Sequence, residues 1–119
     1  MNRTGLKLKD SEANMAALKI LKKHFPNESL ASLKDKIQNG DCIYLTGKEK
    51  YVIDGKKMIA ALIHDFDQVN IKTELYEVYT HDGQQKRIPM AREVFFNMLH
   101  RYQVISQQVD EDIDNETDE

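Results

Sequence analysis

The side chains that could do chemistry in this chain are a single cysteine, four histidines and a series of lysines beside apolar residues. Two metal ligands share one face of a helix when they lie three or four residues apart. The histidines do not have that spacing: they are His24, His64, His81 and His100. His64 lies beside Asp65 and Asp67 at the expected end of a helix, and we interpret this group as a solvated helix end rather than a metal site.

Cys42 is the only cysteine, so the chain has no internal disulfide, and a lone thiol is typical of a reducing cytosol. As a nucleophile it would need a histidine base brought near by folding, whereas a cysteine in a strand is more often a small buried apolar residue. The Gly-Lys pairs that begin at Gly47 and Gly55 lack the spacing of a phosphate-binding loop. We therefore expect no catalytic residues, no metal and no cofactor, and we predict that the protein is not an enzyme.

The elements that position these groups follow from hydrophobic periodicity. Asp10 or Ser11 is expected to cap a first helix, with a stripe that includes Met15 and ends before Pro26. Further expected elements, in chain order, are a second helix capped by Asn27 or Ser29 that carries Leu30, Leu33 and Ile37 and ends at Asn39-Gly40, a strand at 42–46, a helix at 55–67 capped by Asp54, a strand at 71–80 and a turn at 81–83. A short strand at Leu6 and Leu8 precedes them.

After Pro89 the spacing of apolar residues predicts one long helix at 90–109. Its stripe is Val94, Phe95, Met98, Leu99, Tyr102, Ile105 and Val109. The end of this helix can project and pair with a second copy or a partner through Met98, Tyr102, Ile105 and Val109. The alternative is that the whole stripe belongs to the core. The predicted fold class is α+β, a small antiparallel sheet covered on one face by helices, in the order (β)ααβαβ plus the C-terminal helix.

Charge is distributed unevenly along the 119 residues, whose net charge is −3. The last ten residues, DEDIDNETDE, hold seven of the 20 acids, which leaves 17 bases against 13 acids and a net charge of +4 in the rest. We predict a single domain at 1–109 and a disordered, solubilising tail at 110–119. The alternatives for the tail are a mimic of nucleic acid or a shield over the basic body. No segment reads as a secretory signal or membrane span, so a cytoplasmic location is expected.

The stretch ALKILKKHFPNESLASLKDKIQNG, followed by KKMIAALIHDFDQVNIKTELYEV, resembles the C-terminal domain of the bacterial ribosomal stalk protein. The resemblance covers about residues 13–78 and includes LASLKDKI, which is similar to the family's Leu-Lys-x-Ala-Lys-Asp-Leu-Val helix. It departs from the family where Asn27, Glu28 and Ser29 replace turn glycines. The family's dimerisation domain and alanine-rich hinge have no counterpart, and the long C-terminal helix and acidic tail are additions.

In that family the first two helices dock translation factors through basic residues beside apolar ones. Carried over, the resemblance implies a docking face of Leu18, Lys19, Lys22 and Lys34. The alternative is that these lysines are the solvated sides of two helices. We therefore predict a non-enzymatic protein–protein interaction module, from a bacterium or its phage, that docks another protein through these helices.

A second hypothesis is a small inhibitor or immunity protein, of the kind found in phages and mobile elements, that blocks an enzyme with its acidic tail. Direct binding of nucleic acid by the basic body ranks lowest, because the lysines are dispersed and the tail repels phosphate.

Overall fold

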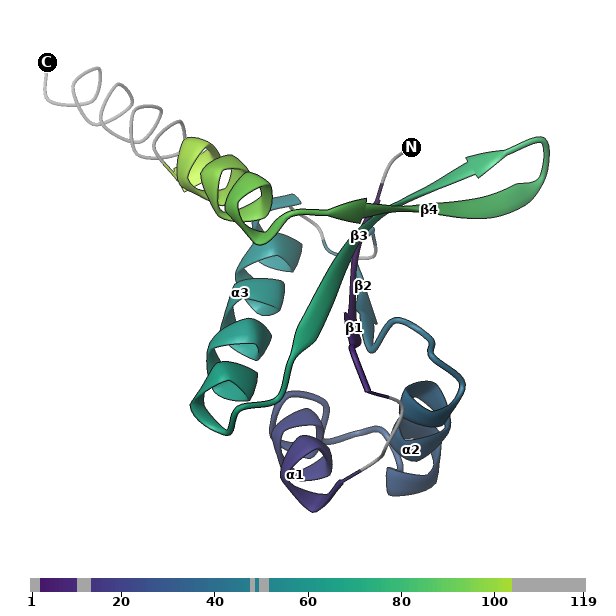
Figure 1. Ribbon diagram of the computed structural model, residues 1–119, viewed down its shortest axis with the longest axis vertical. Helices are drawn as coiled ribbons and strands as arrows, with labels where there is room; N and C mark the ends of the chain where they lie inside the picture. The colour runs from purple at the N-terminus through teal and green to yellow at the C-terminus, as the bar shows by residue number, and fades with distance from the viewer. Residues whose placement is uncertain (1–2, 11–13, 48, 50–51, 104–119) are drawn as a thin grey trace, which may run out of the picture.

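The computed structural model describes residues 3–10, 14–47, 49 and 52–103, and within them the chain forms a four-stranded sheet and four helices. In chain order the elements are β1 (Arg3–Leu8), α1 (Met15–His24), α2 (Leu30–Gln38), β2 (Tyr44–Leu45), α3 (Val52–Gln68), β3 (Thr73–His81) and β4 (Gln84–Met90), then a C-terminal helix at 92–103 (Figure 1). The predicted α+β class is confirmed. The predicted order was incomplete, because it lacked β4.

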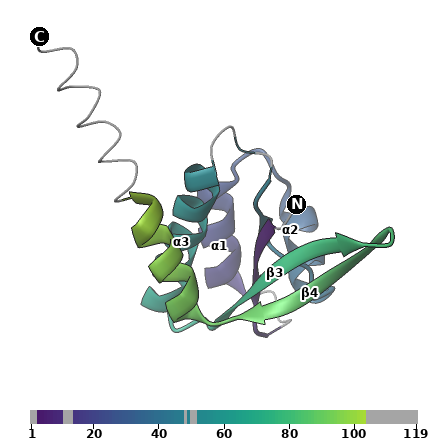
Figure 2. The ribbon, with the colours of Figure 1, turned by 90° about the horizontal axis from the view of Figure 1, so that it is seen from above.

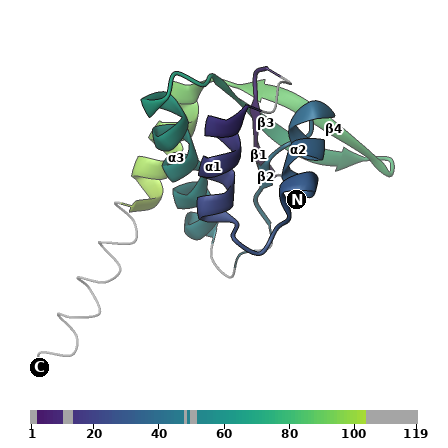
Figure 3. The same ribbon diagram turned by 90° about the horizontal axis from the view of Figure 1, so that it is seen from below.

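The sheet has the strand order β2-β1-β3-β4, and every neighbouring pair is antiparallel. Figure 3 shows α1, α2 and α3 in front of the strands, and Figure 2, from the opposite side, shows β3 and β4 in front. The helices therefore gather on one face, which we call the helical face, and the other face is left open over β3 and β4. The tip of the β3–β4 hairpin projects beyond the rest of the sheet.

Alternation along β1 explains why one face is covered. Leu6 and Leu8 are 0% and 5% exposed and point toward the helices, while Gly5 and Lys7 lie on the open face. The helices bury their apolar stripes against those two leucines. Side chains from all four helices contribute to the resulting core, which includes Leu18, Leu21, Leu33, Ile37, Ile59, Leu62, Phe66 and Phe95.

The first two helices end where predicted, but their starts differ in part. Asn14 caps α1 by accepting a hydrogen bond from the Ala17 amide at 2.8 Å, so the prediction of Asp10 as the cap was wrong, and Ser11 lies outside the described residues. Ser29 caps α2, as predicted, and Gly40 follows that helix at φ 70°. Because each helix begins only at these caps, its first residue, Met15 or Leu30, lies at the margin of the core and is exposed.

The third helix begins earlier than predicted. Asp54 lies in the first turn of α3 and is not its N-cap. The side chains of Thr46 and Glu49 lie close to this helix, since a Cβ on Gly55 would be 2.9 Å from a side-chain atom of each. The chain that follows β2 therefore packs directly on the backbone of α3. The strand before it, Tyr44–Leu45, is shorter than the predicted 42–46, although the amides of Ile43 and Thr46 on either side also donate to β1, to Leu6 at 2.7 Å and to Thr4 at 3.0 Å.

β4 was missed because its sequence, QQKRIPM, does not alternate and contains Pro89. A two-residue turn at Asp82 and Gly83, both with positive φ, joins it to β3 and confirms the predicted turn. Counted from that turn, alternate residue pairs exchange hydrogen bonds, and the pair Tyr76–Pro89 falls on a position that does not. The proline nitrogen therefore faces the free edge of the sheet, where no hydrogen bond is lost.

The C-terminal helix is described over 92–103, and the rest of the predicted helix, 104–109, lies outside the described residues. Met90 belongs to β4, so the predicted start at 90 was wrong. Phe95 and Leu99 enter the core, but Val94 is 50% and Tyr102 is 40% exposed, so only part of the stripe is buried. None of the helices in the described part of the chain is long and apolar enough to cross a membrane.

Gly5 generates the first testable prediction, because a Cβ at this position would lie 2.7 Å from the Cys42 sulfur and 3.3 Å from Val78. We expect Gly5→Ala to lower the free energy of unfolding by about 1–3 kcal/mol, as overpacking does. Adding Cys42→Ala should recover part of this loss, because it removes the sulfur. Urea unfolding of the two single variants and the double variant measures the coupling. Strictly additive effects would contradict the proposed contact.

Candidate functional site

The predicted docking face of α1 and α2 is not assembled as expected. Leu18 is 3% exposed and belongs to the core, so it offers a partner almost no surface and does not support its prediction as the apolar contact. Lys22 Nζ donates to the carbonyl oxygens of Pro26 at 2.9 Å and Glu28 at 2.5 Å, which closes the turn between the two helices. Lys19 and Lys34 are exposed. These two lysines are the part of the predicted face that remains available.

The acidic group near His64 is divided between two structural contacts. Asp65 Oδ2 lies 2.7 Å from His24 Nε2 and 3.4 Å from Lys23 Nζ, which ties α3 to the end of α1. Arg92 binds both oxygens of Asp67, at 2.9 Å and 3.2 Å. The hydrogen bond from His24 lowers the pKa of Asp65. Within the described ranges, no three metal-binding side chains come together.

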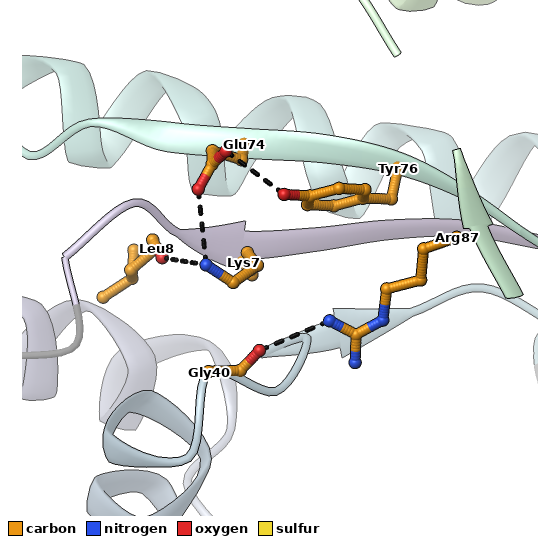
Figure 4. Close-up of polar contacts among 6 residues, drawn as sticks. All are labelled: Lys7, Leu8, Gly40, Glu74, Tyr76 and Arg87. Atoms are coloured by element: carbon orange, nitrogen blue, oxygen red, sulfur yellow. Dashed lines mark hydrogen bonds and ion pairs between the residues drawn. The ribbon is translucent and has the colours of Figure 1, made fainter. Parts of the chain in front are cut away.

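Polar side chains also cover part of the open face of the sheet (Figure 4). Glu74 accepts hydrogen bonds from Lys7 at 3.3 Å and from Tyr76 at 3.2 Å, while Arg87 lies over the Tyr76 ring and reaches the Gly40 carbonyl at 3.4 Å. Burial raises the pKa of the nearby Cys42 thiol, with partial opposition from Arg87 and Lys7. The thiol is therefore protonated at neutral pH and is a poor nucleophile. We interpret this network as a brace across the sheet.

A groove of about 560 Å³ lies on the helical face, between the sheet and the C-terminal helix. Figure 1 shows this helix beside the first turns of α3. The strands contribute mainly polar side chains to the lining, and the helix contributes apolar ones. The lining includes Arg3, Thr4, Thr46 and Glu77 from the sheet side, Val94, Met98 and Tyr102 from the C-terminal helix, and Lys56 from α3. Met98 and Tyr102, predicted as partner contacts, therefore belong to one surface, while Ile105 and Val109 lie outside the described residues.

Lys56 is the unusual member of this groove. It is only 5% exposed, and its ammonium lies 5.8 Å from the centre of the Phe95 ring and 5.6 Å from that of Tyr102. In the described part of the chain, no carboxylate lies within ion-pair distance of it. Burial lowers the pKa of Lys56. The two rings stabilise the cation by cation–π attraction, but they do not neutralise its charge.

The sequence analysis missed Lys56, although its position carried a signal. Lys56 precedes Ile59, Ile63 and Phe66 at steps of three, four and three residues, so it continues the buried stripe of α3. We interpreted the Lys-Lys pair only as a poor match to a phosphate loop. A lysine at a position that the helical period assigns to the core is the pattern to look for. The neighbouring Lys57 is exposed, as a surface lysine should be.

Comparison with known proteins adds no assignment: no family model, curated protein or solved structure matches this chain. The resemblance to the ribosomal stalk domain therefore stays a prediction from the sequence.

Lys56 supplies a second prediction. Lys56→Met should raise the free energy of unfolding at pH 7 by about 1 kcal/mol, because methionine fills similar space without a buried charge. Lys57→Met, the exposed neighbour, should change it by less than about 0.5 kcal/mol. Because folding lowers the pKa of Lys56, the folded chain releases this proton at a lower pH than the unfolded chain does. The two states therefore differ in protonation in the pH window between the folded pKa and the ordinary pKa of 10.5. Below that pH window the charge of Lys56 lowers the free energy of unfolding by its full amount. The gain in stability from Lys56→Met should therefore shrink as the pH rises through the window. Urea unfolding from pH 7 to 10.5 measures this, and a destabilised Lys56→Met variant would contradict it.

Asp65 supplies a third prediction. Asp65→Asn should lower stability at pH 7 by about 1 kcal/mol, because it weakens a charge-assisted hydrogen bond to His24. A carboxylate with a lowered pKa stabilises the fold above its ordinary value of 3.8 and loses that effect as the pH falls through the folded value. The difference between wild type and variant should therefore narrow in acid. Thermal unfolding between pH 2.5 and 7 tests this, with the exposed Asp35→Asn as the control. A difference independent of pH would show that the charge is not involved.

Proposed function

We propose that this chain is a non-enzymatic protein-binding module whose docking surface is the groove beside the C-terminal helix. The observation that carries the proposal is the concentration of apolar surface at this groove. Val94 and Tyr102 are among the large apolar residues that the fold leaves exposed, and both line it together with Met98. Aromatic and methionine side chains are enriched in the centres of protein interfaces.

The groove is suited to a segment of a partner protein. One wall is a sheet and the other is a helix anchored in the core by Phe95 and Leu99, so both walls are regular secondary structure that is already formed without a partner. The helix lines the groove with apolar residues, whereas the strands contribute Arg3, Thr4 and Glu77 as well as Pro89 and Met90. A partner segment that presents apolar side chains toward the helix and polar groups toward the strands would match both walls. Helices and strands in such grooves are common modes of peptide recognition.

The surface of α1 and α2 that carries Lys19 and Lys34 is the rival docking surface. It was predicted from the sequence, but fewer of its residues are available to a partner than expected. Leu18 is buried, and Lys22 donates its hydrogen bonds to backbone carbonyls of the turn between α1 and α2. Inhibition through the acidic tail also stays a prediction, because 110–119 lie outside the described residues. A single binding experiment with variants at each surface separates the groove from this rival face.

The test is selection of a random peptide display library on the full chain, followed by measurement of peptide affinity by fluorescence anisotropy. Val94→Asp should weaken the selected peptides at least tenfold, because it places a charge in the apolar wall. Leu30→Asp is the matched control, since Leu30 and Val94 are each 50% exposed on a helix. The control should bind as wild type does, and so should a Lys19→Glu, Lys34→Glu double variant.

Two results would count against the groove. One is a loss of affinity in the Lys19→Glu, Lys34→Glu variant with no change in Val94→Asp, which would return the site to α1 and α2. The other is a selection that enriches no peptide above a control surface. Circular dichroism of each variant ensures that a loss of binding is not a loss of folding.

A further inference from the structure

We propose that Lys56 is the specificity anchor of the groove and that the partner segment places an Asp or Glu side chain against its ammonium, with apolar side chains on either side. This inference rests on the proposed function and adds the chemistry of the partner to it.

The first argument is that Lys56 has a charge without a counter-charge. The residue as a whole is 5% exposed and no carboxylate of the described residues pairs with it, while its ammonium nitrogen is not fully enclosed and can be reached from the groove. Glu77 lines the same groove, but no ion pair joins it to Lys56. Buried charges in proteins are normally paired, because transfer from water to a low-dielectric site is costly. A partner that brings a carboxylate would supply the missing charge.

The second argument is that the surroundings favour a single carboxylate on an apolar scaffold. The ammonium lies between two aromatic rings, and Val94 and Met98 line the groove beside it. One carboxylate neutralises one ammonium, whereas a dianionic phosphate would leave excess charge next to apolar walls. Arg3 and Glu77, which also line the groove, carry opposite charges, so the charged residues of the lining have a net charge of one positive unit, which a single carboxylate matches.

The third argument concerns which carboxylate is bound. Phe95 and Tyr102, the rings on either side of Lys56, are separated by about two helical turns, or roughly 10 Å along the helix. Val94, Met98 and Tyr102 line the groove at successive turns of the helix, so the groove continues from Tyr102, beside the ammonium, to Val94, and a partner chain can extend along it. This position suits an internal side chain better than a chain terminus.

The test uses two small probes of the same shape, 3-phenylpropionate and its uncharged amide, 3-phenylpropionamide. Each is titrated into the full ¹⁵N-labelled chain at constant ionic strength, and amide chemical shifts report the site and the affinity. We expect the carboxylate to bind at least fivefold more tightly than the amide and to shift the amides of Val94, Met98 and Tyr102. Lys56→Met should abolish this preference, while Lys57→Met, which removes the exposed neighbouring lysine, should preserve it.

Peptides from the display selection extend the test, synthesised with blocked ends so that only side chains carry charge. Replacing their acidic residue by its amide, Glu→Gln or Asp→Asn, should weaken binding about tenfold on wild type and less than twofold on Lys56→Met. A peptide that needs a free C-terminal carboxylate instead would overturn the assignment to an internal side chain.

The outcomes separate the two proposals. Equal binding of carboxylate and amide in the groove, with affinity that depends on Val94, would leave the docking function intact and overturn the role of Lys56. A carboxylate preference that persists in Lys56→Met would also overturn it. Failure of both probes to shift groove amides, with selected peptides insensitive to Val94→Asp, would overturn both proposals.

Discussion

The pairing of β1 on both of its edges is the constraint on which the rest of the molecule depends. β1 is hydrogen-bonded to β2 on one side and to β3 on the other, over all six of its residues on the β3 side. Its alternation then divides the molecule, since Leu6 and Leu8 face the helices and Gly5 and Lys7 face away. The core, the brace on the open face and the sheet side of the groove all follow from the placement of this one strand.

Local signals predicted much of the fold. Pro26 and Gly40 act through their own backbone geometry, so the ends of α1 and α2 were predictable without knowledge of tertiary contacts. β4 was not predictable in this way. β4 is a strand because it pairs with β3. In the sequence Pro89 indicated the start of a helix, but in the pairing with β3 its nitrogen faces solvent.

The candidate site was less predictable than the fold, because side-chain burial decides it. Leu18 stands beside lysines in the sequence and was expected to contact a partner, but it points into the core. Lys56 stands beside another lysine, and only its position one turn before Ile59 indicated burial. A buried charge conflicts with the apolar stripe around it, and natural sequences retain such local conflicts mainly where function requires them. This conflict is what distinguishes the groove from the other polar surfaces described above.

The central position of β1 also has a consequence for how the chain reaches its folded state. The residues that β1 pairs with on β3 lie some 65 to 75 positions later, as in Leu8↔Thr73 and Arg3↔Val78. During synthesis on the ribosome, β1, α1 and α2 emerge before that partner strand does, because α2 ends at Gln38 and β3 begins only at Thr73. Folding of the sheet must therefore wait until β3 has left the exit tunnel, and closing so long a loop slows the search. Until then the apolar side of β1 is open to chaperones and to misassociation.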